Sequence, residues 1–337
     1  MDPEAGRQTR LLKRTDNLAR LRIWQSLFAL GAIAIAGYLL HRAVERYGID
    51  AIVASVQGFT AGQLVPVGLF AVASYLCLTG FDALALRYVR QDVPYPYVAM
   101  TSFTSLSLGH NIGFAALSSG TIRFRLYSRY GLTAADIARL IVFCGVTVGL
   151  GLITLAGIVL AGRAQLASGA LGVPTGVAVL LGAACICIAA GYVAACRFIR
   201  RPVSVRGFSL SLPSPGLALG QILVGTLNFA LVAGCVHQAI GVAHDVPYLA
   251  VVAVYVLANL VAVISHVPGG LGVIESVVLT LIPGETVLGG LIVFRIAYYF
   301  IPLILGTIIF ALSELVRSRR RNAVRAGSRS AGSTIGS

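Results

Sequence analysis

The sequence predicts an all-α polytopic membrane protein, and three observations lead to that prediction. Of the 337 residues, 57% are hydrophobic and only 11% are charged, a composition typical of integral membrane proteins. Apolar stretches recur at a length near the about 20 residues that a helix needs to cross a bilayer. Basic residues flank these stretches. We therefore expect about six full transmembrane helices and two re-entrant helical hairpins, arranged as an inverted repeat.

The chain divides into three parts by composition. Residues 1–20 form a basic N-terminal segment, and residues 21–315 hold the apolar segments of an integral membrane domain. Residues 316–337 are rich in Arg, Ser and Gly, which predicts a disordered tail. By the positive-inside rule, the basic residues at both ends place the N- and C-termini in the cytoplasm.

Six apolar segments are expected to span the membrane. The first is too long, with too long a basic leader, for a signal peptide, so we expect it to stay uncleaved. In the third, Gly145, Gly149 and Gly151 predict close packing against another helix. The segments are Ile23–Leu40, Leu64–Val89, Ala134–Ala161, Thr175–Ala195, Gly216–Val242 and Leu288–Leu312.

The segment Val98–Gly120 does not fit a simple span. It is rich in Ser, Thr and Gly, and Arg123, Arg125 and Arg129 follow it. A single crossing would place these arginines outside, whereas a hairpin that dips into the membrane and returns keeps them on the cytoplasmic side. The residues expected at its tip are Gly109, His110 and Asn111.

A second hairpin is predicted over Tyr248–Ile282, entering from the opposite face. It contains VPGGLGVIES (Val267–Ser276), where a proline and adjacent glycines should break the helix. The residues expected at its tip are Pro268, Gly269 and Gly270. The halves, roughly 21–161 and 175–315, then repeat the same order of spans and hairpin in opposite orientation. This pattern is typical of transporters, in which two broken elements meet near the midplane.

Three charged residues inside apolar segments are candidates for a functional site, since each costs about 2.5–3.5 kcal/mol at the bilayer centre. They are Asp82, Glu275 and Arg295. The alternative for Asp82 is a structural ion pair with Arg87 or another basic residue. The alternative for Glu275 is capping of the short helix after the break, where the helix dipole favours a carboxylate. Arg295 is expected to pair with Glu275 or Asp82.

Arg123 and Arg125 stand beside Tyr127 and Tyr130. A planar guanidinium binds phosphate through two parallel hydrogen bonds, and tyrosines anchor at the head-group level. The alternative is an ordinary solvated basic loop. The candidate substrate-binding residues are Asp82, Arg123, Arg125, Glu275 and Arg295.

No pattern in the sequence indicates an enzyme active site, a metal or a cofactor. The six cysteines lie in or beside apolar segments and are expected to be small buried hydrophobes. A P-loop, a dinucleotide fingerprint and a Ser-His-Asp set are all absent from the sequence. The net charge of +14 follows from membrane topology, so nucleic acid is not an expected partner.

Several motifs resemble the membrane region of the bacterial lysyl-phosphatidylglycerol synthase/flippase family, the multiple peptide resistance factors. The resemblance covers nearly all of Leu21–Leu315. The motifs are GFDALALRY (Gly80–Tyr88), SFTSLSLGHNIGFAALSSG (Ser102–Gly120), GTIRFRLYSRYGL (Gly120–Leu132), VPGGLGVIES (Val267–Ser276) and VFRIAYYFIP (Val293–Pro302).

The resemblance implies a function in lipid transport. In that family the membrane region moves aminoacylated phospholipid from the inner to the outer leaflet, and Asp82, Arg123 and Glu275 match its functionally important charged positions. Arg125 and Arg295 lie in the same motifs. The family's proteins continue into further membrane helices and a cytoplasmic aminoacyl-transferase domain, so synthase activity is not expected from this chain.

The leading hypothesis is a stand-alone flippase of the bacterial inner membrane, with a membrane phospholipid such as lysyl-phosphatidylglycerol as its partner. Two alternatives stay open. One is a membrane subunit of a system that modifies lipid head groups, acting with a separate soluble synthase. The other is a lipid-binding scaffold without transport, with ion pairs that only stabilise the fold. Homo-oligomerisation is compatible with each hypothesis.

Overall fold

The computed structural model describes residues 48–112, 115–199, 203–205, 208–241, 246–265 and 267–333, together with residues 41 and 45. The predicted first span, Ile23–Leu40, lies outside these residues. The helices are α2 (Ile49–Gln57), α3 (Ala61–Tyr88), α4 (Tyr95–Ile112), α5 (Ala115–Tyr127), α6 (Ala134–Gly162), α7 (Ala164–Leu171), α8 (Thr175–Phe198), α9 (Pro215–Ile240), α10 (Tyr248–Ser265), α11 (Val273–Leu281), α12 (Glu285–Arg295) and α13 (Ile301–Ser333).

The remaining elements are short. Two 3₁₀ turns, η1 (Ser128–Tyr130) and η2 (Pro268–Gly270), follow α5 and α10, and the π-helical segment η3 (Ile296–Phe300) joins α12 to α13. The strands β1 (Val203–Val205) and β2 (Phe208–Leu210) pair antiparallel between α8 and α9. Helices make up the rest of the regular structure that the model describes, as the sequence predicts.

Six helical stretches of the described chain are long and apolar enough to cross a membrane. Five of them coincide with predicted spans, and the sixth is α10, the first arm of the predicted second hairpin. The protein is therefore an all-α multi-pass membrane protein. The stretches are Ala61–Tyr88, Ala134–Gly162, Thr175–Phe198, Pro215–Ile240, Tyr248–Ser265 and Val287–Arg317.

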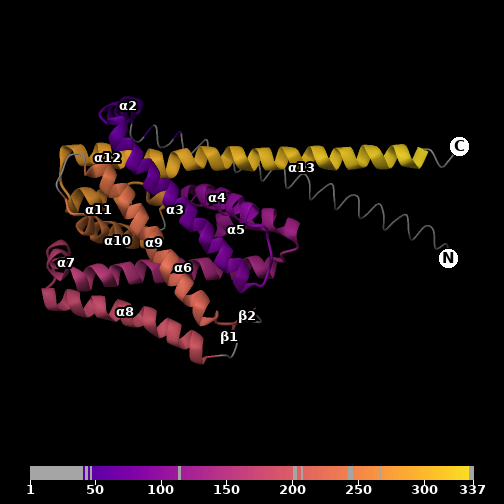
Figure 1. The fold of residues 1–337 in the computed structure, drawn as a ribbon. Coiled ribbons are helices and arrows are strands. Elements are labelled where there is room, and N and C mark those ends of the chain that lie inside the picture. The colour runs from indigo at the N-terminus through magenta and orange to yellow at the C-terminus, as the bar shows by residue number, and fades with distance from the viewer. Residues whose placement is uncertain are drawn as a thin grey trace.

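The long helices form the body of the molecule. α3 packs along α9, and α6 packs against both α8 and α9 (Figure 1). At Gly151 on α6 and Gly225 on α9, the two helices approach so closely that a methyl group on either glycine would overlap the backbone of the other helix. The prediction of close packing thus holds at Gly151. It is wrong for Gly145 and Gly149, which meet open space because they lie on another side of the helix.

Both predicted hairpins are present as packed pairs of helices. α4 packs against α5, and α10 packs against α11. At the second tip, Gly269, Gly270 and Gly272 have φ angles of +62°, +57° and +81°. Glycine adopts this left-handed region without the steric cost that other residues carry, so these residues end the helix as predicted. The face from which each hairpin enters the membrane stays a prediction.

The tips of the two hairpins touch each other. Gly269 lies against the first tip, with its Cβ position 3.6 Å from the His110 carbonyl oxygen and 3.9 Å from the Asn111 Cα. The residues predicted for the first tip, Gly109, His110 and Asn111, lie in the last turn of α4, and the connection to α5 lies outside the described residues. The two arms pack closely there, because the Cβ position of Gly109 lies 2.8 Å from the Ser119 Cβ on α5. The prediction that two broken elements meet is confirmed.

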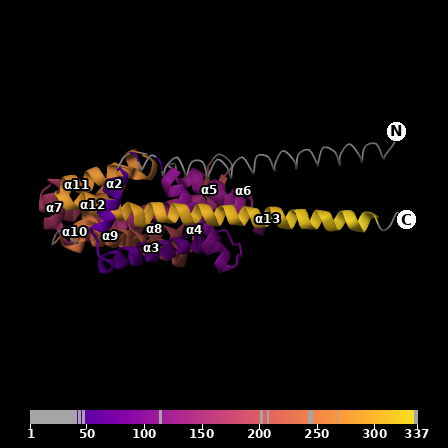
Figure 2. The same cartoon turned by 90° about the horizontal axis from the view of Figure 1, so that it is seen from above.

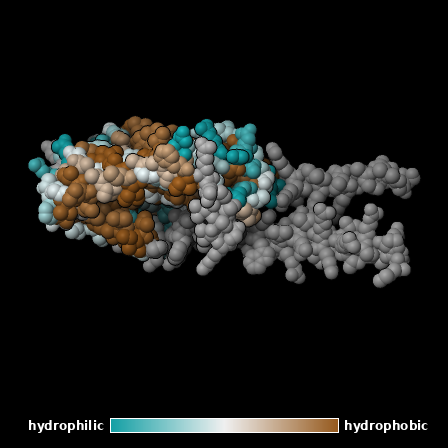
Figure 3. Space-filling view, turned by 90° about the horizontal axis from the view of Figure 1, so that it is seen from below, coloured by the Kyte–Doolittle hydropathy of each residue, from teal (hydrophilic) through white to brown (hydrophobic). Residues whose placement is uncertain are grey.

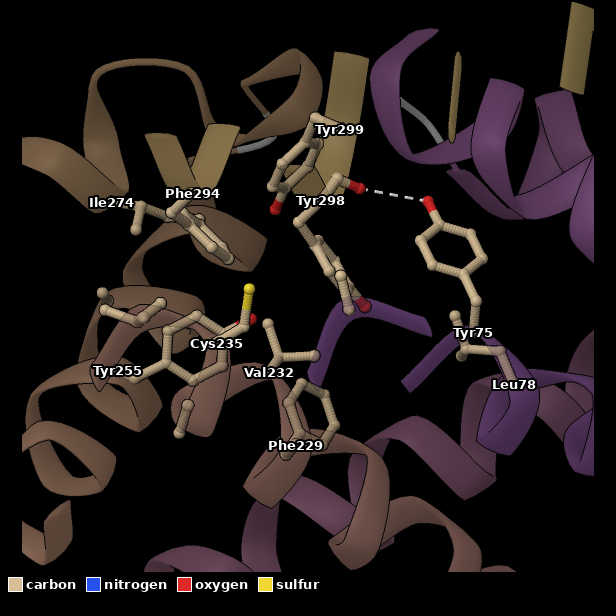
Figure 4. Close-up of a cluster of buried hydrophobic side chains, with 14 of the residues drawn as sticks. Tyr75, Leu78, Phe229, Val232, Cys235, Tyr255, Ile274, Phe294, Tyr298 and Tyr299 are labelled. Carbon is tan, nitrogen blue, oxygen red and sulfur yellow. Dashed lines mark hydrogen bonds between the residues drawn. The ribbon is translucent and has the colours of Figure 1, made fainter. Parts of the chain in front are cut away.

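A buried cluster rich in aromatic side chains gathers residues from α3, α9, α10, α12 and η3 (Figure 4). The Tyr75 hydroxyl on α3 donates a hydrogen bond to the Tyr298 carbonyl (3.2 Å) in η3. The Asn111 amide of the first tip points to the Tyr299 carbonyl (3.4 Å). A π-helical turn departs from the usual ladder of backbone hydrogen bonds, and here side chains from α3 and α4 approach its carbonyl groups.

The last helix is longer than the sequence predicts. α13 runs along α4 and continues to Ser333, projecting beyond the other helices (Figures 1 and 2). The prediction of a disordered tail over 316–337 is therefore wrong as far as Ser333. Extending an existing helix avoids the cost of nucleation, and Arg and Ala are good helix formers. Disorder was predicted from composition, which ignores that preceding helix.

Candidate functional site: two buried ion pairs

The first ion pair joins Asp82 on α3 to Arg123 on α5. The Arg123 Nη2 lies 2.7 Å from Asp82 Oδ1, and Nε lies 3.2 and 3.1 Å from the two carboxylate oxygens. Both side chains are buried, at 0% exposure for Asp82 and 3% for Arg123. The partner of Asp82 is thus a basic residue on the first hairpin and not the nearby Arg87.

Further side chains complete this first site. The Tyr127 hydroxyl donates to Asp82 Oδ2 (2.8 Å), and Arg123 Nη1 donates to Ser119 Oγ (3.0 Å). The Cys144 thiol on α6 lies 3.9 Å from Asp82 Oδ1. Ser119 and Tyr127 stand four residues before and after Arg123, which places all three on one face of α5. Sequence reasoning missed Ser119, although this spacing could have identified it.

The second ion pair joins Glu275 on α11 to Arg295 at the end of α12. Arg295 Nε lies 2.5 Å from Glu275 Oε1, and Nη2 lies 3.0 Å from Oε2. The same carboxylate accepts a hydrogen bond from the Gly272 backbone N–H (2.8 Å). Glu275 therefore caps α11, as the alternative interpretation expected, and also pairs with Arg295. Its role in a functional site stays a prediction.

Arg295 also binds the backbone of the second tip. It donates through Nη1 to the Gly269 carbonyl and through Nη2 to the Gly270 carbonyl (2.8 Å). Its guanidinium carbon lies 4.4 Å from the centre of the Tyr299 ring, a distance at which a cation is attracted to the ring face. Arg295 thus ties two backbone carbonyl groups of the glycine turn to its guanidinium group, and only 1% of its side chain is exposed.

A continuous series of contacts connects the two pairs through the hairpin tips. Arg123 is hydrogen-bonded to Ser119, which packs against Gly109 of the first tip, and Arg295 is hydrogen-bonded to Gly269 of the second tip. Packing contacts join one tip to the other. In order along the series, the residues are Asp82, Arg123, Ser119, Gly109, His110, Gly269, Arg295 and Glu275.

Arg125 does not belong to this site. It pairs instead with Glu314 on α13, with Nε 3.0 Å from Oε1 and Nη2 2.6 Å from Oε2. Two residues along a helix correspond to a rotation of about 200°, so Arg123 and Arg125 face different sides of α5. The pattern of nearby arginines suggested one phosphate site, whereas the structure separates the two side chains.

The first hairpin is unusually polar for a buried element. Thr101, Ser102, Thr104, Ser105 and Ser107 on α4 are all at most 1% exposed. The described residues contain no group of three or more His, Cys, Asp or Glu side chains that could hold a metal ion. The described residues therefore provide two buried ion pairs and a row of buried hydroxyl groups on α4.

Comparison with known proteins shows similarity to bacterial membrane proteins. The chain is 34% identical over 259 residues to inner membrane protein YbhN of Escherichia coli, covering 74% of this chain and 80% of YbhN. It is 29% identical over 322 residues to the uncharacterized protein slr0712 of Synechocystis sp., covering 94% and 98%. It is also 38% identical over 86 residues to phosphatidylglycerol lysyltransferase of Staphylococcus aureus, covering 23% and 10%. No family model matches the chain.

Proposed function

We propose that this chain, which belongs to the same family as inner membrane protein YbhN, moves phospholipids between the two leaflets of the bacterial inner membrane. The six long apolar helices support a location within a bilayer, and the name of YbhN supports the inner membrane. The match to phosphatidylglycerol lysyltransferase supports an aminoacylated phosphatidylglycerol, such as lysyl-phosphatidylglycerol, as the lipid. Both termini are placed in the cytoplasm in this proposal, following the basic residues.

The observation that carries the proposal is the presence of two buried ion pairs at touching hairpin tips. Buried ion pairs contribute little net stability, because desolvation of the charges offsets their attraction. Ionisable residues within a membrane domain are rare and are by default candidates for a substrate pathway. Two such pairs, one in each half of the chain, therefore favour a role in binding a charged substrate.

A phospholipid head group has the chemistry to replace either partner. A phosphate can accept the parallel hydrogen bonds that Arg123 gives to Asp82, or those that Arg295 gives to Glu275, because guanidinium binds phosphate and carboxylate in the same geometry. The amine of a lysyl head group can then pair with a released carboxylate. The phosphate and this amine are then each paired with a group of opposite charge.

The contact between the hairpin tips offers a way for the site to open alternately toward each leaflet. Opening the first pair frees the arm α5, and opening the second frees the turn that Arg295 holds. Because the tips pack on each other, movement of one hairpin changes the support of the other. Rocking of two halves around a central site is the motion by which inverted-repeat transporters expose a substrate to each side.

Reconstitution into vesicles tests the proposal. The measurement is the fraction of labelled phosphatidylglycerol or lysyl-phosphatidylglycerol that becomes accessible to a membrane-impermeant quencher. Asp82→Ala and Glu275→Ala are expected to slow translocation about tenfold or more, since a charged hydrogen bond contributes about 1.5–3 kcal/mol. The control is Asp136→Ala, which removes a carboxylate paired with Arg139 at the start of α6. Variants that move lipid as fast as the unchanged protein would refute the site.

A membrane subunit of a head-group-modifying system is the second candidate, favoured by the 86-residue match to phosphatidylglycerol lysyltransferase. In that case the chain would act with a separate soluble synthase. Lipid analysis of a strain lacking the gene distinguishes the two functions. Loss of a lipid species indicates modification, whereas an unchanged lipid composition with an altered leaflet distribution indicates translocation.

A further inference from the structure

A cluster of charges outside the two buried pairs surrounds Glu314 on α13. Arg125 grips this carboxylate with two hydrogen bonds, of 3.0 and 2.6 Å. Arg129 in η1 donates to Glu314 Oε1 (2.7 Å), and Arg317 forms a longer ion pair with the same oxygen (3.8 Å). Three guanidinium groups thus converge on the Glu314 carboxylate.

The cluster is reachable from outside the protein. The side chains of Arg129 and Arg317 are 24% and 20% exposed, whereas those of Arg125 and Glu314 are 9% and 16% exposed. An excess of positive charge in a partly buried position attracts anions more strongly than in water, because screening is weaker there. The cluster is therefore suited to an additional anion.

The surroundings place the cluster at the edge of the apolar surface. Leu312, Leu315 and Val316 on α13 are all more than half exposed, and the next residue is Arg317. Figure 3 shows hydrophobic side chains over much of the visible face, with hydrophilic ones gathered largely toward one end. The rings of Tyr97 and Tyr130 lie 4.5 Å apart close to Arg129. Tyrosines beside basic residues are typical of the head-group level of a bilayer.

We propose that Arg125, Arg129 and Arg317 form a binding site for the phosphate of an anionic phospholipid, and that Glu314 occupies this site when the lipid is absent. A carboxylate and a phosphodiester present two acceptor oxygens in a similar arrangement, so one can replace the other on a guanidinium fork. The site lies apart from the two buried pairs, and its occupation by lipid does not require that the protein translocates anything.

The site lies next to α5, the hairpin arm that is proposed to move during translocation. Glu314 fastens α13 to α5 through Arg125 and to η1 through Arg129. A lipid phosphate that displaces Glu314 releases this fastening, and α5 also carries Arg123 of the first buried pair. Anionic lipid at this surface site would therefore loosen the hairpin arm that holds Asp82.

Lipid titration of the purified full-length chain in detergent tests the site, with bound lipid counted by native mass spectrometry. The probes are phosphatidylglycerol and the zwitterionic phosphatidylcholine. The double variant Arg129→Gln/Arg317→Gln is expected to bind phosphatidylglycerol about thirtyfold more weakly, from about 1 kcal/mol for each arginine. Binding of phosphatidylcholine should stay the same. Glu314→Gln is expected to strengthen binding of phosphatidylglycerol, because the competing charge is gone.

The matched control is Arg139→Gln, which removes an arginine at the start of α6 that is paired with Asp136 at 3.5 Å. It is expected to bind phosphatidylglycerol like the unchanged protein. Equal binding by the double variant and the unchanged protein, or weaker binding by Glu314→Gln, would overturn the site. An excess of inorganic phosphate should leave the lipid bound. If it displaces the lipid, the ligand is a soluble phosphate and the assignment to phospholipid is wrong.

Discussion

The two buried ion pairs differ in which element supplies the positive charge and which supplies the negative charge. In the first, the hairpin arm α5 supplies the cation, Arg123, and the long helix α3 supplies the carboxylate, Asp82. In the second, the hairpin arm α11 supplies the carboxylate, Glu275, and α12 supplies the cation, Arg295. Each pair therefore joins the second arm of a hairpin to a helix outside that hairpin. The arm carries the positive charge in the first pair and the negative charge in the second.

The pairs also differ in what else holds them. The first is supported by side-chain hydroxyl groups, those of Ser119 and Tyr127. The second is bound to the backbone of the glycine turn through Arg295. A hydroxyl group can rotate away, whereas a carbonyl group moves only with its chain. The first pair is thus expected to open while its tip keeps its shape, and opening of the second is expected to deform its tip.

The largest effect is expected from Arg295→Met. This change leaves the Glu275 charge and the carbonyl groups of Gly269 and Gly270 without their main donor. Removing one partner of a buried pair costs about 3–5 kcal/mol, and the loss of the carbonyl contacts places this variant at the upper end. Thermal unfolding in detergent measures the cost, and translocation should be abolished.

Asp82→Asn is expected to destabilise the protein less, by about 3 kcal/mol. The Asn oxygen can still accept a hydrogen bond from Arg123, and the Tyr127 hydroxyl is free to reorient. Unfolding experiments on both variants under the same conditions compare the two pairs directly. If Asp82→Asn is as destabilising as Arg295→Met, the distinction between side-chain and backbone support is wrong.

Gly109→Ala is expected to disturb the connection between the pairs. The added methyl group would lie 2.8 Å from the Ser119 Cβ, and overpacking of this kind costs about 1–3 kcal/mol. Since Ser119 accepts a hydrogen bond from Arg123, the rate of translocation should fall by a larger factor than the loss of folding free energy alone explains. Gly145→Ala on α6 is the control, because nothing lies within 4 Å of its Cβ position. Similar translocation by both alanine variants would speak against coupling through the tips.

The smallest effect is expected far from the pairs, at the N-terminus of α6. Thr133 caps this helix by accepting a hydrogen bond from the Asp136 N–H (3.2 Å). Thr133→Ala should lower stability by about 1 kcal/mol, the usual value for a lost N-cap, and leave translocation unchanged. A strong loss of translocation in this variant would show that general stability, rather than the buried pairs, limits transport.

The sequence was informative about features that local chemistry determines. Three glycines with positive φ angles interrupt the helical structure next to Pro268, as the sequence predicted. The charged residues Asp82, Glu275 and Arg295 are all paired in the interior. The meeting of the tips was expected because the loop charges assigned the two hairpins to opposite faces of the membrane, an assignment that stays a prediction.

Other features depend on contacts between distant parts of the chain, and the sequence did not reveal them. The partner of Arg125 is Glu314, which is 189 positions away and lies just before the segment predicted to be disordered. Neighbouring arginines on one helix looked like a single site, although the structure directs them to different partners. The helical tail likewise depends on the helix that precedes it.

The central claim is that the buried pairs bind a head group and are not required to hold the fold. The double variant Asp82→Val/Arg123→Met tests it most directly, because replacing a buried ion pair by apolar residues of similar volume is often close to neutral for stability. We predict an unfolding temperature within about 4 °C of the unchanged protein, together with loss of phospholipid translocation in vesicles. A folded double variant that moves lipid at the unchanged rate would contradict the claim.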